Sequence, residues 1–209
     1  MKPDIDYTLY LCTDRRLMTT ETLEESVELA IKGGVTVVQL REKECSSREF
    51  YKLAKAVKTI TDAYEVPLII NDRVDIALAI GADGVHLGQK DIPVQVARDL
   101  LGADKVVGAT ANTVELAKEA YQAGADYLGV GDVFGTTTKE DTKHITQEEL
   151  KEICRAVEIP IVAIGGINEE NISLLRQTGV DGAAVISAVV GKKDITAAAE
   201  RLISNFRGA

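Results

Sequence analysis

The chain alternates between short, nearly continuous apolar runs and longer segments in which apolar residues recur every three or four positions. Continuous apolar runs are typical of strands buried on both faces of a parallel sheet, whereas the longer period predicts amphipathic helices. Strands are predicted at residues 8–13, 35–40, 67–70, 84–87, 105–110, 127–133, 160–164 and 182–187. Helices are predicted at 22–32, 46–64, 74–80, from Pro93 onward, and at 114–123, 147–157, 169–178 and 194–206.

Eight strand–helix pairs in 209 residues, with no break in composition, predict a single α/β domain spanning residues 1–209. The fold expected is one (β/α)8 TIM barrel. A doubly wound open sheet is the alternative, but it usually has fewer strands at this length, and no GxGxxG follows the first strand. Gly-Ala-Asp at 81–83 and 124–126, and Gly-Val-Asp at 179–181, mark returns from helix to strand.

The composition and charge of the chain limit the classes of molecule that it is expected to bind. The net charge of −9 disfavours nucleic acid and anionic membranes as partners. Cys12, Cys45 and Cys154 show no CxxC spacing, which is typical of reduced thiols in a cytoplasmic protein and disfavours a zinc site. No apolar leader or membrane-length run is visible, and no oligomeric state follows from the sequence.

Polar residues follow the predicted strands, and in a TIM barrel the carboxyl ends of all strands meet at one mouth, where active sites lie. His86 differs from the other polar residues, because it lies within a predicted strand and a lone histidine there is typically a hydrogen-bonded core residue. The other strand-end residues are Gln39, Arg41, Lys43, Asn71, Asp72, Gln89, Asp91, Thr110, Asn112, Thr136, Thr138, Lys139, Gly165, Gly166 and Ser187.

Their chemistry indicates a site for a metal and a diphosphate. Arg41, Lys43 and Lys139 supply positive charge, and Asp72 and Asp91 are carboxylates of the kind that bind Mg²⁺ together with phosphate oxygens and water. The Gly165-Gly166 pair leaves backbone N–H groups free to approach a phosphate, and loops seven and eight of barrels commonly hold one. We therefore expect a diphosphate near strands two to four and a monophosphate near strands six to eight.

Several motifs, in this order, resemble the thiamine-phosphate synthase family. They are Val38-Gln39-Leu40-Arg41-Glu42-Lys43, Asn71-Asp72-Arg73, Gly84-Val85-His86-Leu87-Gly88-Gln89 with Asp91, Thr136-Thr137-Thr138-Lys139, Ile164-Gly165-Gly166-Ile167 and Ile186-Ser187-Ala188. The resemblance covers nearly the whole chain and implies a (β/α)8 barrel. It also implies a transferase that joins an aminopyrimidine methyl diphosphate to a thiazole phosphate, releasing diphosphate and thiamine phosphate. Thr110 stands where the family usually has serine, and it keeps the hydroxyl.

The resemblance implies a role for each matching residue. Gln39, Leu40, Arg41, Glu42, Lys43, Asn71, Thr110 and Lys139 would bind the pyrimidine diphosphate, with Arg41, Lys43, Lys139 and Thr110 acting in catalysis. Asp72 and Asp91 would hold Mg²⁺, and Thr136, Thr137, Thr138, Gly166, Ile186 and Ser187 would bind the thiazole phosphate. Two alternatives are a thiazole tautomerase-like sister enzyme, expected to lack Asp91 and the threonine–lysine run, and a non-catalytic phosphate-binding barrel.

Overall fold

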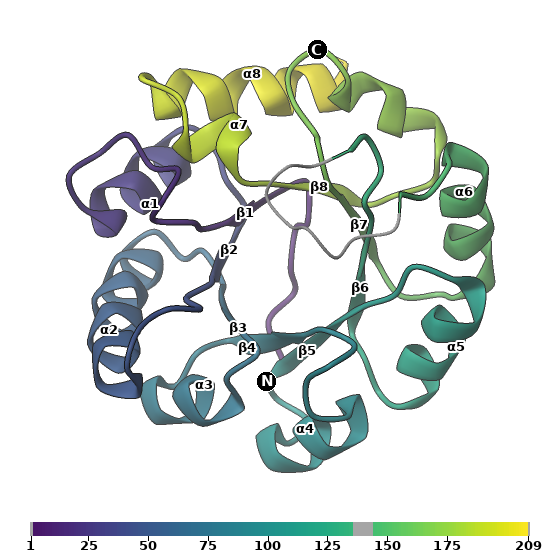
Figure 1. Ribbon diagram of the computed structural model, residues 1–209, viewed down its shortest axis with the longest axis horizontal. Helices are drawn as coiled ribbons and strands as arrows, with labels where there is room; N and C mark the ends of the chain where they lie inside the picture. The colour runs from purple at the N-terminus through teal and green to yellow at the C-terminus, as the bar shows by residue number, and fades with distance from the viewer. Residues whose placement is uncertain (1, 136–143, 209) are drawn as a thin grey trace.

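Eight parallel strands close into a barrel, as the computed structural model, which describes residues 2–135 and 144–208, shows in Figure 1. Each strand pairs with its neighbours in chain order, and β8 closes on β1. The strands are β1 (Leu9–Cys12), β2 (Val37–Leu40), β3 (Leu68–Asn71), β4 (Gly84–Leu87), β5 (Val106–Thr110), β6 (Tyr127–Val130), β7 (Ile161–Ile164) and β8 (Gly182–Val185). The predicted (β/α)8 barrel is therefore confirmed.

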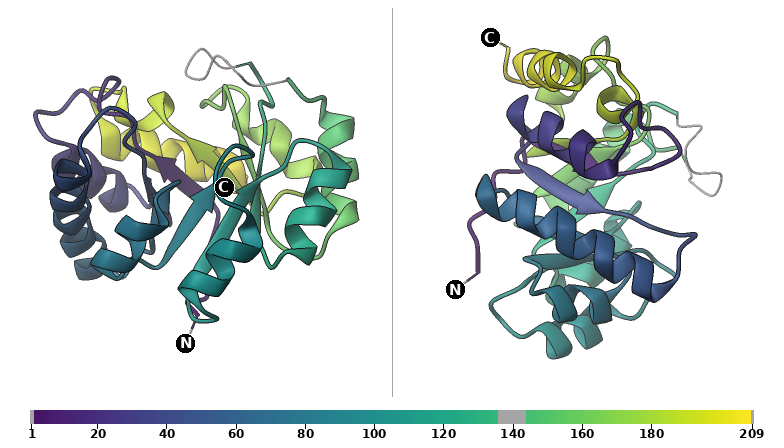
Figure 2. Two further views of the ribbon diagram at one scale, coloured as in Figure 1. Left: turned by 60° about the horizontal axis from the view of Figure 1, so that its bottom comes forward. Right: turned by 90° about the vertical axis from the view of Figure 1, so that its left-hand side faces the viewer.

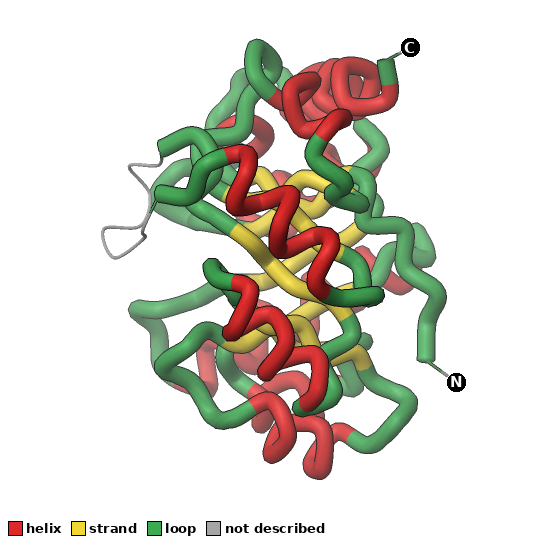
Figure 3. Tube along the Cα trace, turned by 90° about the vertical axis from the view of Figure 1, so that its right-hand side faces the viewer, coloured by secondary structure: helices red, strands yellow, loops and turns green. Residues whose placement is uncertain are grey.

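Helices cover the outside of the barrel, and the strands lie within (Figure 3). They are α1 (Leu23–Lys32), α2 (Ser47–Ala63), α3 (Val74–Ile80), α4 (Val94–Leu101), α5 (Val114–Gln122), α6 (Gln147–Ala156), the 3-10 helix η1 (Ile172–Gln177), α7 (Ser187–Val190) and α8 (Ile195–Arg207). None of the helices in the described ranges combines the length and apolar character needed to cross a membrane.

Alternate residues of each strand face two different cores, because side chains in a strand point to opposite sides. One set packs against the surrounding helices and includes Leu11, Val38 and Leu40. The other set fills the barrel interior and includes Tyr10, Val37, Ile69, Val106, Tyr127, Val162 and Ala184. Both faces of each strand are thus buried, which explains why the strands read as continuous apolar runs.

At the amino-terminal end of the barrel, the same aspartate contact occurs three times and joins a helix-to-strand turn to the preceding strand. In each Gly-x-Asp turn the aspartate exchanges two hydrogen bonds with the first residues of the preceding strand. The carboxylates of Asp83, Asp126 and Asp181 accept from the amides of Leu68, Val107 and Ile161 at 2.9, 2.8 and 2.7 Å. The aspartate amides donate back to the carbonyls of the same residues at 3.0, 2.7 and 2.8 Å. The amino-terminal segment closes this end (Figure 2), where Ile5 and Tyr7 pack against the interior cluster.

Three predicted elements differ in the structure. The strand expected at 127–133 ends at Val130. The helix expected at 169–178 is the shorter 3-10 helix η1, preceded by a turn in which Asn168 and Asn171 side chains bond backbone amides. The strand expected at 182–187 ends at Val185, and Ser187 begins the short helix α7. Ile186 and Ser187 therefore lie where β8 ends and α7 begins.

Candidate active site

The cations predicted after β2 lie at the mouth, held by acidic partners. The amide of Arg41 donates to Thr13 Oγ1 at 3.0 Å, which joins the ends of β1 and β2. The Arg41 side chain is largely buried, and its guanidinium lies 3.8 Å from the buried carboxylate of Asp14. No described residue accepts a hydrogen bond from Arg41 Nε. Lys43 is exposed, and its Nζ lies 3.1 Å from Asp72 Oδ2.

Asp72 and Asp91 lie close together beside this cationic pair. Asp72 has a φ of 64°, a left-handed conformation that aspartate tolerates better than most residues, and its amide donates to the His86 carbonyl at 2.9 Å. Asp91 Oδ2 accepts from the Gly88 amide at 2.6 Å. Partial burial, together with the adjacent Asp72 carboxyl group, raises the pKa of Asp91 above its ordinary value. Two crowded carboxylates of this kind suit a divalent cation.

No group of three or more His, Cys, Asp or Glu side chains arranged for a metal is found among residues 2–135 and 144–208. Mg²⁺ commonly takes one or two protein carboxylates and completes its shell with phosphate oxygens and water. A metal at Asp72 and Asp91 would therefore depend on the substrate for part of its coordination.

A cavity of about 550 Å³ occupies the mouth of the barrel. Its floor is polar as well as aromatic, with Gln39, Tyr10, Tyr127, His86 and Thr110 all lining it. His86 Nε2 lies 3.0 Å from Thr110 Oγ1, so this histidine is directly bonded to a predicted site residue. His86 is thus buried and hydrogen-bonded, as expected of a core residue, and it also lines the cavity.

The loops after β7 and β8 form the other end of the cavity. Gly165, Gly166, Ile186 and Ser187 line it, as the two-anion hypothesis requires. Gly166 has a φ of 64°, and a Cβ there would lie 2.2 Å from the Gly135 carbonyl oxygen, so a side chain is excluded. Lys192, which the sequence analysis did not single out, also lines this end and adds a cation to it.

Three of the predicted site residues, Leu40, Glu42 and Asn71, have side chains that are buried or paired within the protein. Leu40 is fully buried in the core between sheet and helices, so its side chain faces away from the cavity. Glu42 Oε2 accepts from Arg15 at 2.6 Å, which gives this carboxylate a protein partner. Asn71 is buried at the end of β3. The predicted Thr136, Thr137, Thr138 and Lys139 lie outside the described residues.

Sequence reasoning did not single out Tyr10 and Tyr127, which lie on the cavity floor. Both stand inside apolar runs, where an aromatic residue is normally a core residue. The sequence signal that could have found them is the alternation of side chains along each strand. Tyr10 and Tyr127 occupy inward-facing positions, and they share the interior cluster with residues from most other strands.

Comparison with known proteins shows the family to which this chain belongs. The family model described as thiamine monophosphate synthase matches residues 9–189. The thiamine-phosphate synthase of Ruminiclostridium cellulolyticum is 59% identical over 206 residues, covering 99% of this chain and 98% of the relative. That of Clostridium tetani is 55% identical, covering 97% of each. The solved thiamine phosphate pyrophosphorylase of Pyrococcus furiosus is 43% identical, with a TM-score of 0.90, covering 97% of this chain and 96% of that one.

The relatives match nearly the full length of this chain, and the solved structure is a barrel of the same shape. The order of the sequence motifs pointed to the same family. The chain belongs to the thiamine monophosphate synthase family of transferases.

Proposed function

We propose that this chain joins 4-amino-2-methyl-5-(diphosphooxymethyl)pyrimidine to the thiazole phosphate, releasing diphosphate and forming thiamine phosphate. The bond from the methylene carbon to the diphosphate oxygen breaks, and the thiazole nitrogen bonds to that carbon. The observation that carries the proposal is the cluster of Lys43, Asp72 and Asp91 beside a cavity of about 550 Å³. Its position suits a metal-bound diphosphate whose pyrimidine ring occupies the cavity.

Leaving-group stabilisation is the main chemical task. The aminopyrimidine can stabilise positive charge on its methylene carbon, so the reaction needs groups that accept the charge growing on the diphosphate. Arg41, whose Nε donates to no described residue, and the exposed Lys43 are suited to this task, and Lys139 is assigned to it by the family resemblance. The attacking nitrogen carries no proton, so no general base is required.

Mg²⁺ is the metal we propose for Asp72 and Asp91. It would neutralise charge on the diphosphate oxygens as the carbon–oxygen bond breaks. The residues fit this ion, because Asp91 is fixed by the Gly88 amide through one oxygen and lies against Asp72. Lys43, whose Nζ lies 3.1 Å from Asp72 Oδ2, would supply positive charge to the same diphosphate.

Substrate positioning falls to the remaining residues. We assign Gln39, Asn71 and Thr110 to the pyrimidine, with Leu40 and Glu42 contributing only main-chain groups because their side chains are buried or paired. Gly166, Ile186 and Ser187 are assigned to the thiazole phosphate, together with Thr136, Thr137 and Thr138 from the resemblance. The cavity lining at Gly166, Ile186 and Ser187 supports this assignment.

The catalytic unit is proposed to be the single domain 1–209, acting on small molecules in the cytoplasm, since no disulfide joins Cys12, Cys45 and Cys154. Asp91 and the Thr136–Lys139 run favour the synthase over a tautomerase. A phosphate sensor has no need of a metal-activated leaving group.

Diphosphate release from purified protein tests the proposal. Both substrates with Mg²⁺ should release diphosphate and form thiamine phosphate in equal amounts, whereas chelation with EDTA should abolish both. Rearrangement of the thiazole phosphate alone would support the tautomerase, and binding without turnover would support the sensor.

A further inference from the structure

A chain of hydrogen bonds crosses the barrel interior beneath the cavity. Gln39 Nε2 on β2 donates to Tyr10 Oη on β1 at 2.8 Å. Tyr10 Oη lies 2.6 Å from Tyr127 Oη on β6, which in turn lies 2.9 Å from His86 Nδ1 on β4. His86 Nε2 meets Thr110 Oγ1 on β5 at 3.0 Å. The chain therefore links the two proposed pyrimidine-binding side chains, Gln39 and Thr110, through three residues with no assigned role.

The number of protons available gives this series of hydrogen bonds a direction. Tyr10 Oη accepts from the Gln39 amide, and Tyr127 Oη is its other partner among the described residues, so we assign the Tyr10 proton to Tyr127 because this gives it an acceptor. The Tyr127 proton then goes to His86 Nδ1, which leaves the histidine proton on Nε2 to be donated to Thr110 Oγ1. In this arrangement every buried hydroxyl in the chain has an acceptor. Burial raises the pKa of Tyr10 and Tyr127 well above the ordinary value, so both phenols keep their protons.

The direction of these hydrogen bonds determines which groups Gln39 and Thr110 present to a ligand. One of the two Gln39 Nε2 hydrogens is donated to Tyr10, which fixes the orientation of the amide, and no described residue donates to Gln39 Oε1, so this carbonyl oxygen is left as an acceptor for the cavity. Thr110 accepts from His86, so its own proton is free to be donated. The cavity therefore presents one fixed acceptor and one fixed donor.

Two inward-facing glycines make room for the chain. A Cβ at Gly108 would lie 2.2 Å from the Tyr127 ring, and one at Gly129 would lie 3.0 Å from His86 Cε1. Both glycines stand on strands, where glycine weakens the sheet and often marks a close approach of another group. Their placement matches the need to seat these two rings in the barrel interior.

We propose that Tyr10, Tyr127 and His86 are positioning residues that set the donor and acceptor pattern of Gln39 and Thr110, and so select an amidine edge on the pyrimidine. A 4-aminopyrimidine offers an amino donor beside a ring-nitrogen acceptor, which complements a carbonyl acceptor and a hydroxyl donor. A 4-oxopyrimidine offers the reverse pattern, a carbonyl acceptor beside a ring N–H. This inference rests on the proposed function, because it takes the pyrimidine to lie between Gln39 and Thr110.

Calorimetric binding of two probes tests the proposal without turnover. The probes are the 4-aminopyrimidine methyl diphosphate and its 4-oxo counterpart, each titrated in Mg²⁺ into wild type, Tyr127→Phe, Tyr10→Phe and Tyr7→Phe. Tyr7 is the matched control, since its ring packs 4.9 Å from that of Tyr127 while its hydroxyl lies outside the chain. Wild type and Tyr7→Phe should prefer the amino probe by about a hundredfold or more, because a site built for one pattern leaves polar groups unpaired with the other.

Tyr127→Phe and Tyr10→Phe should each reduce this preference by about tenfold or more, because Gln39 and Thr110 can then reorient. A merely structural role would alter melting temperature but leave the ratio of the two dissociation constants unchanged. An unchanged ratio in both variants, or failure of wild type to bind either probe, would overturn the positioning role. Binding with normal selectivity but no diphosphate release would instead refute the proposed reaction and leave the positioning role standing.

Discussion

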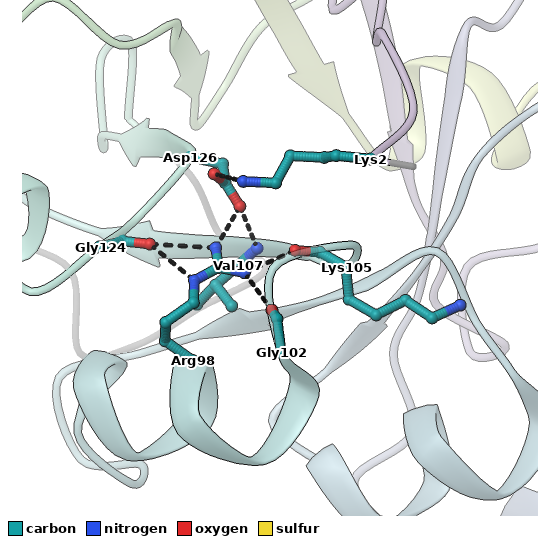
Figure 4. A network of polar contacts seen from close by, with 7 residues as sticks. All are labelled: Lys2, Arg98, Gly102, Lys105, Val107, Gly124 and Asp126. Carbon is teal, nitrogen blue, oxygen red and sulfur yellow. Dashed lines mark hydrogen bonds and ion pairs between the residues drawn. The ribbon is translucent and has the colours of Figure 1, made fainter.

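Replacement of Arg98 by methionine is expected to lower the free energy of unfolding by about 3 kcal/mol without affecting catalysis. Figure 4 shows the guanidinium at the start of β5, between two helix-to-strand turns. Its NH1 donates to the carbonyls of Gly102 and Lys105 at 2.8 and 2.7 Å, and its NH2 donates to Gly124 at 3.0 Å. It also forms an ion pair with Asp126, whose carboxylate bonds the Val107 amide.

The magnitude follows from how little water reaches these groups. The Arg98 and Asp126 side chains are only 16% and 19% exposed, so the lost partners are incompletely replaced by solvent. A hydrogen bond to a charged group contributes about 1.5–3 kcal/mol, and breaking a buried ion pair costs about 3–5 kcal/mol. Lys2 also pairs with Asp126, which places the expected loss at the lower end of that range. For a domain of this size about 3 kcal/mol corresponds to roughly 6–12 °C in melting temperature.

Urea denaturation of wild type, Arg98→Met and Arg155→Met measures the effect. Methionine keeps much of the stem that packs near Gly124, so the change reports chiefly on the lost polar contacts. Arg155 is the control, since it is 71% exposed and lies 3.9 Å from Glu148, and its loss should cost under about 0.5 kcal/mol. Diphosphate release should be unchanged, because Arg98 lies at the opposite end of the barrel from the mouth. A cost for Arg98→Met within about 1 kcal/mol of the control would refute this reasoning.

Three further predictions concern the site. Asp91→Asn keeps an acceptor for the Gly88 amide, so melting temperature should hold while turnover falls about a hundredfold or more; near-normal turnover in EDTA would contradict the metal role. Lys139→Ala should lower kcat and kcat/KM together, whereas Thr138→Ala should mainly raise KM for the thiazole phosphate; steady-state kinetics in each substrate decide between these roles. Lys192→Met should raise the thiazole phosphate KM several-fold, by about 1 kcal/mol at most, and the effect should shrink with added salt; an equal KM at low salt would exclude a phosphate contact.

The barrel could be predicted because its signals are local. Strands buried on both faces give apolar runs, and glycine ends the intervening helices, as Gly81 does after α3. The errors have local causes too. The Asn168 and Asn171 side chains compete for backbone amides, which leaves only the 3-10 helix η1. The apolar residues of the four-residue helix α7 extend the β8 run, and periodicity cannot separate so short a helix from a strand.

The charged part of the site was visible for the same reason, since Arg41, Asp72 and Asp91 interrupt apolar runs at strand ends. The tyrosine–histidine chain was not visible, because its links join residues far apart in the sequence. Tyr10 and Tyr127 are 117 positions apart, and only closure of the barrel brings their hydroxyls within 2.6 Å. The nearest sequence signal lies in the glycines rather than the tyrosines. Gly108 and Gly129 occupy inward positions on neighbouring strands, where a small residue implies that a large side chain crosses the axis from elsewhere.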